Sequence, residues 1–150
     1  MNPTNNRSSS RLKLELELGE QLNILISAAH ALNVKSAARF DPELQPAAFL
    51  LVRWLLSHGP ASATALAEAT AMDRSSVTRL INPLKERGYV YSEPDPNDRR
   101  GVRLSLTDSG RKQAEEALKL KETVFYGSIA KWEDNKLEQF ITLLDQFNSP

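Results

Sequence analysis

The spacing of apolar residues changes between residues 73 and 107, and this change constrains the fold more than any other feature. From Asp73 to Gly88 the apolar residues recur every three or four positions, which is the pattern of an amphipathic helix. From Val102 to Leu106 apolar and polar residues alternate, which is the pattern of a half-buried strand. The chain is therefore expected to place a β-hairpin directly after a helix.

A second, shorter helix is expected just before this one. Ser62 can cap a helix that ends near Thr70, and Asp73 can cap the next, because both side chains accept hydrogen bonds from free N–H groups at a helix N-terminus. Only a tight turn at residues 71–72 separates the two segments. Two short helices joined so closely predict a helix-turn-helix.

The hairpin is expected to follow the second helix of this pair. The run 89–93, YVYSE, is typical of a strand and can pair with residues 102–106. Pro94 and Pro96 limit pairing to the end of the first strand, because proline cannot donate a ladder hydrogen bond. We therefore expect a loop over residues 94–101, longer than a minimal turn.

The rest of the chain is predicted to be helical. Leucines between residues 11 and 39 recur at spacings of three and four, and no turn signal interrupts them, so a long amphipathic helix fits better than a strand. The predicted fold is mainly α with a small β-hairpin (α+β). A winged helix-turn-helix lobe over about 46–107 joins a helical region over about 11–39 and 108–147. Residues 11–150 form one domain, and residues 1–10 are expected to be a flexible tail.

Composition excludes several classes of function. The chain has no cysteine, which excludes disulfides, thiolate catalysis and zinc–thiolate sites. Its two histidines lie on separate predicted helices and form a poor metal site, so neither a metal nor another cofactor is expected. There is no phosphate-binding glycine loop and no Gly-x-Ser-x-Gly pattern, so we do not expect an enzyme.

The N-terminus and the length of the apolar runs indicate where in the cell the protein is expected. The N-terminus lacks the apolar core of a signal peptide, and no apolar run approaches the length of about 18 residues that spans a bilayer. We expect a cytoplasmic protein without a membrane partner. The chain has 19 basic and 19 acidic residues, so net charge does not indicate a partner and the distribution of charge must decide.

The helix after Asp73 carries polar groups outside its apolar stripe. An α-helix fits the major groove of DNA, where arginine can pair with guanine or phosphate and hydroxyls can bind phosphates or bases. A solvated polar face is the alternative interpretation of the hydroxyls. The candidate DNA contacts are Arg74, Ser75, Ser76, Thr78, Arg79 and Asn82.

The tip of the predicted hairpin is rich in arginine. Arg99, Arg100 and Arg103 lie within five residues, and arginine is the side chain that exploits the negative potential of a narrow minor groove. Asp98 would repel phosphate, so we expect it to pair with Arg100, stiffening the loop and directing Arg99 outward. A cluster of surface ion pairs without a partner is the alternative, and such pairs contribute little stability.

Two segments, DRSSVTRLINPLKERGYV and DPNDRRGVRLSLTDSG, resemble the MarR family of bacterial transcriptional regulators, and with the order of helices the resemblance extends over about residues 11–147. It implies homodimers of winged-helix lobes, with the first and the last two helices forming the dimerisation region. It also supports the Asp98–Arg100 pair. The resemblance assigns Ser75, Ser76, Thr78 and Arg79 to the major groove and Arg99 to the minor groove.

The same resemblance implies a small effector. Proteins of this kind often bind aromatic or phenolic anions in a cleft between the dimerisation helices and the winged lobe. His30 lies on the first predicted helix and Arg53 on a second, apolar helix expected from Pro46 to about Ser57, and both could line such a cleft. The simpler interpretation is an ordinary helix histidine and an arginine in a surface ion pair.

Two hypotheses of different classes follow. The first is a dimeric, sequence-specific regulator, a repressor of a palindromic double-stranded DNA operator that a small molecule releases. A twofold dimer suits this role because it reads two half-sites about 34 Å apart. The alternative is a winged-helix module for protein interaction without specific DNA binding.

Overall fold

The computed structural model of the chain describes residues 8–149, so residues 1–7 of the predicted tail lie outside the described part. The elements confirm the predicted fold class, a mainly helical chain with a small sheet. In chain order they are α1 (Ser9–Phe40), α2 (Pro46–His58), β1 (Ala61–Ser62), α3 (Ala63–Thr70), α4 (Arg74–Glu86), β2 (Val90–Asp95), β3 (Asp98–Leu106), α5 (Asp108–Lys121), a π-helical segment (Glu122–Tyr126), α6 (Gly127–Ile129) and α7 (Asp134–Asn148).

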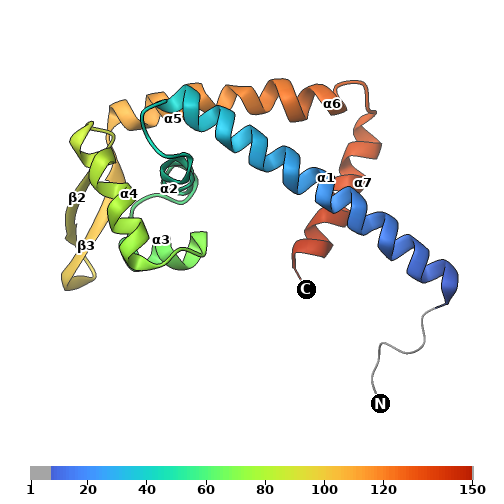
Figure 1. The fold of residues 1–150 in the computed structure, drawn as a ribbon, viewed down its shortest axis with the longest axis horizontal. Helices are drawn as coiled ribbons and strands as arrows, with labels where there is room; N and C mark the ends of the chain where they lie inside the picture. Colours follow the sequence, from blue (N-terminus) through green and yellow to red (C-terminus); the bar gives the residue numbers. More distant parts are fainter. Residues whose placement is uncertain (1–7, 150) are drawn as a thin grey trace, which may run out of the picture.

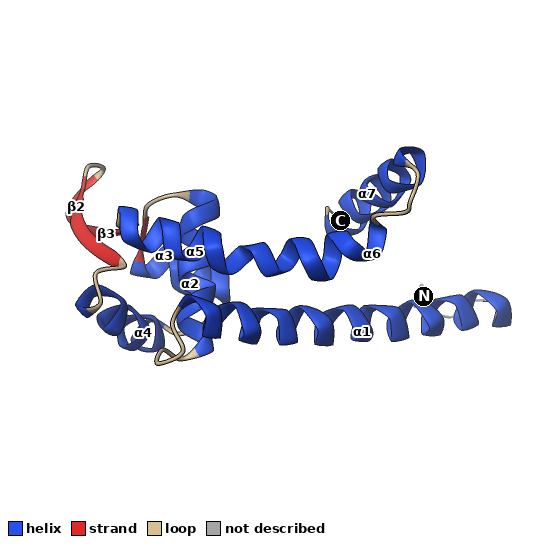
Figure 2. Cartoon of the chain, turned by 90° about the horizontal axis from the view of Figure 1, so that it is seen from above, coloured by secondary structure: helices blue, strands red, loops and turns tan. Residues whose placement is uncertain are grey.

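The molecule has a lobe at one end and a helical arm at the other. Helices α2, α3 and α4 and the sheet form the lobe, with the hairpin at its outer edge (Figures 1 and 2). Helices α1 and α5 pack against each other near the lobe, and α7 lies at the far end in both views. In the part of the chain that the structure describes, no helix combines the length and apolarity needed to cross a membrane.

The helices begin where the sequence places their caps. Ser62 Oγ accepts a hydrogen bond from the N–H of Ala65 at 3.1 Å, and Asp73 Oδ1 accepts one from Ser76 at 2.7 Å. These contacts confirm the predicted starts of α3 and α4. Helix α1 starts at Ser9, so its first residues belong to the segment expected to be a tail.

The sheet contains a strand that the sequence analysis does not predict. Strand β1 pairs with β3, so the order is β1-β3-β2 and all pairing is antiparallel. Ala61 lies opposite Leu104, which places the short strand at the start of α3. The extra strand ties the hairpin to the helix-turn-helix and so fixes the wing relative to α4.

The turn between β2 and β3 consists of residues 96–97, so the prediction of a longer loop over 94–101 is wrong. Two prolines suggested that loop. Pro94 nevertheless lies opposite Val102 in the ladder. This is possible because β2 is an edge strand, where a residue without an N–H is tolerated.

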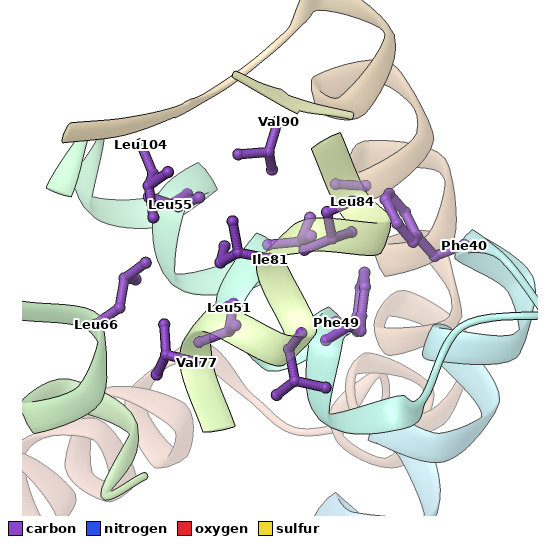
Figure 3. Packing of buried hydrophobic residues seen from close by; sticks show 14 of the residues in the cluster. Phe40, Phe49, Leu51, Leu55, Leu66, Val77, Ile81, Leu84, Val90 and Leu104 are labelled. Carbon is purple, nitrogen blue, oxygen red and sulfur yellow. The ribbon is translucent and has the colours of Figure 1, made fainter. Parts of the chain in front are cut away.

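The hydrophobic core joins α2, α4 and the hairpin. Figure 3 shows Val90 and Leu104 of the hairpin packed over the buried side of α4, which carries Ile81 and Leu84. The predicted apolar stripe of α4 is buried, and it consists of Val77, Leu80, Ile81 and Leu84. A fully buried Leu or Val side chain contributes about 1.5–3 kcal/mol, so this packing holds the polar side of α4 toward solvent. The largest fully buried residues are Phe49, Leu51, Val52, Leu55, Leu66, Val77, Leu84 and Val90.

The helical region predicted from residue 108 onward is not a continuous α-helix. Helix α5 ends at Lys121, and the chain continues through the π-helical segment Glu122–Tyr126 before α6. Thr107 caps the start of α5, because its Oγ1 accepts a hydrogen bond from the N–H of Gly110 at 2.9 Å.

Candidate nucleic-acid interface

Asp73 organises the first turn of α4. Its Oδ1 accepts hydrogen bonds from the hydroxyl of Ser75 at 2.6 Å and from the N–H of Ser76 at 2.7 Å. Its Oδ2 accepts a third from the hydroxyl of Ser76 at 2.8 Å. These bonds, that from the Ser75 hydroxyl most of all, hold the pKa of Asp73 far below its ordinary value. The carboxylate is therefore charged at any physiological pH.

This capping decides what the two serines can offer to DNA. Each hydroxyl has one proton, and both protons are donated to Asp73. The oxygens are left as acceptors, and Ser76 Oγ already accepts a bond from Arg79 Nη2 at 3.1 Å. While the cap is intact, Ser75 and Ser76 are therefore suited to the amino groups of adenine or cytosine in the major groove rather than to phosphate oxygens.

We expect Asp73→Ala to lower the midpoint of urea unfolding, because the free N–H groups of α4 lose their acceptor. The carboxylate stabilises the fold fully above its unfolded pKa, about 3.9, and loses this effect as pH falls toward the lowered pKa of the folded state. The difference in urea midpoint between wild type and variant should thus be constant near neutral pH and become smaller below about pH 4. Asp73→Ser, which keeps a neutral cap, is the control. A difference in urea midpoint that grows at acidic pH would contradict the role of Asp73 as a charged cap of α4.

A groove of about 680 Å³ separates α4 from the wing. Arg74, Thr78, Asn82 and Lys85 line its helix side, at positions three or four residues apart that share one face of an α-helix. Arg100 lines its wing side. Lys85 is not among the predicted contacts, although its spacing of three residues from Asn82 could have identified it.

The start of α3 lies on the same groove. Ser62 and Thr64 line it, and neither is predicted as a contact. Their only sequence signal is the hydroxyl type, which Ser62 also uses to cap α3. The groove is not purely basic, because Asp95 and Asp98 line it as well.

Other predicted contacts lie on a different side of α4. Ser76 and Arg79 line a separate hollow of about 360 Å³, together with Gln45 and Met72. Ser75 is exposed at the first turn. The predicted residues of α4 therefore surround its exposed side, with one group facing the wing and another facing the start of α2.

The tip of the wing is a bulge that carries two of the arginines. Pro94 pairs with Val102 and Asp95 pairs with Asp98, so residues 99–101 have no partner in the register of β2. Arg99 and Arg100 are exposed there. This change of register between Pro94 and Asp95 explains how a turn of two residues still presents an arginine-rich tip.

Asp98 contacts Arg100 through the backbone. Its Oδ1 accepts a hydrogen bond from the N–H of Arg100 at 3.0 Å, and no ion pair joins Asp98 to an arginine among residues 8–149. The expected side-chain pair is thus replaced by a bond that shapes the bulge. The guanidinium of Arg100 remains available to the groove.

Arg103 is placed apart from the other two arginines. Its Nε donates to Glu93 Oε1 at 2.6 Å, and Ser105 Oγ donates to the same oxygen at 3.2 Å. Arg103 and Glu93 lie directly opposite each other in the ladder. Side chains alternate between the faces of a strand, so Arg103 lies on the face opposite buried Leu104, away from the groove. This geometry favours a structural role for Arg103.

The two residues suggested for an effector site lie on the helical side of the lobe. His30 is exposed on α1. Arg53 of α2 makes a long hydrogen bond to Asn33 Oδ1 of α1, at 3.5 Å. Arg53 is therefore positioned where α2 crosses α1.

Comparison with known proteins agrees with this geometry. Residues 43–101 match the model of the MarR family. The HTH-type transcriptional repressor NicR from Pseudomonas putida is 41% identical over 70 residues, which are 47% of this chain and 44% of NicR. The HTH-type transcriptional regulator YxaD from Bacillus subtilis is 32% identical over 106 residues, 70% of this chain and 73% of YxaD. The match to a further relative, YcgE from Bacillus subtilis, covers 61% of that protein, so the chain spans less than two thirds of both NicR and YcgE.

Solved structures share the fold. A mutant MarR from E. coli complexed with operator DNA has a TM-score of 0.62 at 18% identity, and the match covers 89% of this chain and 96% of that one. BpsR from Bordetella bronchiseptica, whose DNA binding is regulated by 6-hydroxynicotinic acid, has a TM-score of 0.58 at 27% identity, covering 86% and 99%. The matched relatives are regulators and not enzymes, as the sequence predicts. The family model, the match along most of YxaD and the winged lobe together show that this chain belongs to the MarR family of transcriptional regulators.

Proposed function

We propose that this chain is a homodimeric repressor that binds a palindromic DNA operator and is released by a small aromatic acid. The observation that carries the DNA-binding part is the groove between α4 and the wing, where Arg74, Lys85 and Arg100 converge. A recognition helix in the major groove would bring the wing tip, with Arg99, to the adjacent minor groove. A mutant MarR of the same fold has been solved with operator DNA, which supports DNA as the partner of this chain.

The helical arm supports the homodimer. Helices α1 and α7 expose large apolar side chains that no other part of the described chain covers. Exposed apolar surface of this extent marks an interaction site. A second copy is the simplest partner, because a twofold axis also supplies the second recognition helix that a palindrome requires. The residues are Leu12, Leu14, Leu16, Leu18, Ile24, Leu25 and Ile26 of α1, and Phe140, Ile141, Leu143 and Phe147 of α7.

The effector part of the proposal rests on BpsR, whose DNA binding is regulated by 6-hydroxynicotinic acid. The repressor part is supported by NicR, which is named a transcriptional repressor. We propose a small aromatic acid for this chain, with Arg53 and His30 as candidate contacts. A titration of the operator complex with 6-hydroxynicotinic acid and benzoic acid tests it, since a release ligand must bind the free form more tightly. Unchanged operator affinity with both acids would contradict this class of effector.

DNA binding is tested by fluorescence anisotropy with the duplex that flanks the gene, at several salt concentrations. We expect Arg99→Ala to weaken binding about tenfold and to lower the slope of log K against log salt by about one. The reason is the loss of a charge placed at an exposed tip. Lys131→Ala, an exposed residue between α6 and α7, is the control, because these helices lie far from the wing (Figure 1).

The same titration separates the two classes of function. A module for protein interaction would leave duplex DNA unbound at all salt concentrations, and Arg99→Ala would then change nothing. Binding without dependence on salt would also contradict the proposal, because neutralised phosphates release counterions.

A further inference from the structure

A buried carboxylate links two parts of the chain that have separate roles in the proposed function. Asp41 follows α1 directly and is 7% exposed. Its Oδ2 accepts hydrogen bonds from Arg87 Nη1 at 3.0 Å and from Tyr89 Oη at 3.1 Å. Its Oδ1 accepts one from the N–H of Glu43 at 3.0 Å. We call Asp41, Arg87 and Tyr89 the α1–α4 clamp.

The clamp joins the end of α1 to the end of α4. Arg87 is the residue after α4, and Tyr89 precedes β2. The partners are 46 and 48 residues from Asp41 in the sequence, so the contacts exist only in the folded lobe. The ring of Tyr89 also packs on Phe40, the last residue of α1, with ring centroids 4.7 Å apart.

Hydrogen bonds are directional, and both oxygens of the Asp41 carboxylate accept them. A buried charge is costly unless it is paired and hydrogen-bonded, and both oxygens of Asp41 have partners. Arg87 is held from a second side, because its Nη2 donates to Glu43 Oε2 at 2.6 Å. Burial and the bond to Asp41 raise the pKa of Tyr89, so its hydroxyl remains a donor at neutral pH. Apolar packing alone would permit small rotations that this geometry resists.

We propose that the α1–α4 clamp sets the orientation of the recognition helix relative to α1, and thereby the distance between the two recognition helices of the dimer. Asp41, Arg87 and Tyr89 are thus positioning residues for operator selection. The inference rests on the proposed function, in which α1 belongs to the dimer interface and α4 reads DNA. The clamp lies between these two parts.

The consequence concerns the spacing of half-sites. Moving a half-site by one base pair shifts it by about 3.4 Å along the duplex, so a rigid dimer prefers one spacing. A lobe that can rotate on α1 populates several helix distances. Such a dimer binds the operator with the preferred spacing less tightly than a rigid dimer does. Its affinity also falls less when the spacing is changed.

The test compares the wild type with Asp41→Asn and Tyr89→Phe. Tyr89→Phe removes one hydroxyl and keeps the ring that packs on Phe40. Each protein is titrated with operators whose central spacer is one base pair shorter, unchanged or one longer, and its unfolding is followed by circular dichroism. Arg39→Gln is the matched control, because Arg39 pairs with Glu116 at 2.8 Å and so joins α1 to α5 without contacting α4.

We expect Asp41→Asn to lower affinity for the preferred spacing about tenfold and to reduce the ratio between spacings by a similar factor. Tyr89→Phe should do the same to a smaller degree, and Arg39→Gln should keep the wild-type ratio. If the folded variants retain that ratio, or lose affinity equally at every spacing, the positioning role is overturned while the proposed function stands. A wild type that binds no operator would instead overturn the proposed function, and the clamp's role with it.

Discussion

Replacing Gly110 with alanine is expected to destabilise the fold strongly. A Cβ at this position would lie 2.2 Å from the carbonyl oxygen of Tyr89 and 2.9 Å from its carbonyl carbon. Those atoms are backbone and cannot swing aside, and the same oxygen accepts a hydrogen bond from the N–H of Thr107 at 3.0 Å. We expect a loss of about 3 kcal/mol or more, out of the 5–15 kcal/mol or so that typically stabilises a domain. Urea unfolding measured by circular dichroism gives the value.

Gly19→Ala is the matched control, because a Cβ there meets nothing within 4 Å. Gly19 lies inside α1, where alanine is favoured over glycine by about 0.5–1 kcal/mol, so the control should be neutral or more stable. If Gly110→Ala unfolds at the same urea concentration as the wild type, α5 does not pack on Tyr89 in this way.

The close packing at Gly110 also gives a physical reason for the end of the segment DPNDRRGVRLSLTDSG, which contains Thr107 and Gly110. Thr107 caps α5 through Gly110 and donates its own hydroxyl to the carbonyl of Gly88 at 2.6 Å. Thr107 therefore links the start of α5 to the turn that follows α4. Its cap could be predicted from the sequence because capping depends on residues three positions apart. Its contact with Tyr89 could not, because that contact spans the hairpin.

The difference between local and long-range contacts also explains which other parts of the fold could be predicted from the sequence. The starts of α3 and α4 and the buried stripe of α4 follow from caps and periodicity, which are local. Strand β1 has two residues, too few to show a period. The π-helical segment has no composition signal that distinguishes it from α5.

The candidate site shows most clearly which features could not be predicted from the sequence. The arginines of the wing could be found by composition, but their separation into exposed Arg99 and Arg100 and paired Arg103 depends on strand register. Register is set by side chains on both strands. Asp41 and Arg87 give no sequence signal at all, because their pairing joins residues 46 positions apart.

The apolar stripe of α1 continues past the lobe. Near the lobe its buried residues include Leu32, Ala37 and Phe40. Toward the N-terminus the same face of the helix is continued by Leu25 and Leu18, which follow the spacing of three and four residues. There they are 44% and 49% exposed. A helix face that is buried in one half and exposed in the other is typical of an interaction site, and here it supports the proposed homodimer.

The double substitution Leu18→Glu and Leu25→Glu is expected to convert the protein to monomers and to weaken operator binding by about 10²–10⁴-fold, because each lobe would then bind one half-site alone. Both side chains are exposed in the single chain, so the lobe should stay folded. Ala31→Glu with Ala38→Glu, which adds the same charge at exposed positions of α1, is the control. Sedimentation velocity gives the assembly state and anisotropy gives the affinity. A folded double variant that remains dimeric would show that this face of α1 is not the dimer interface.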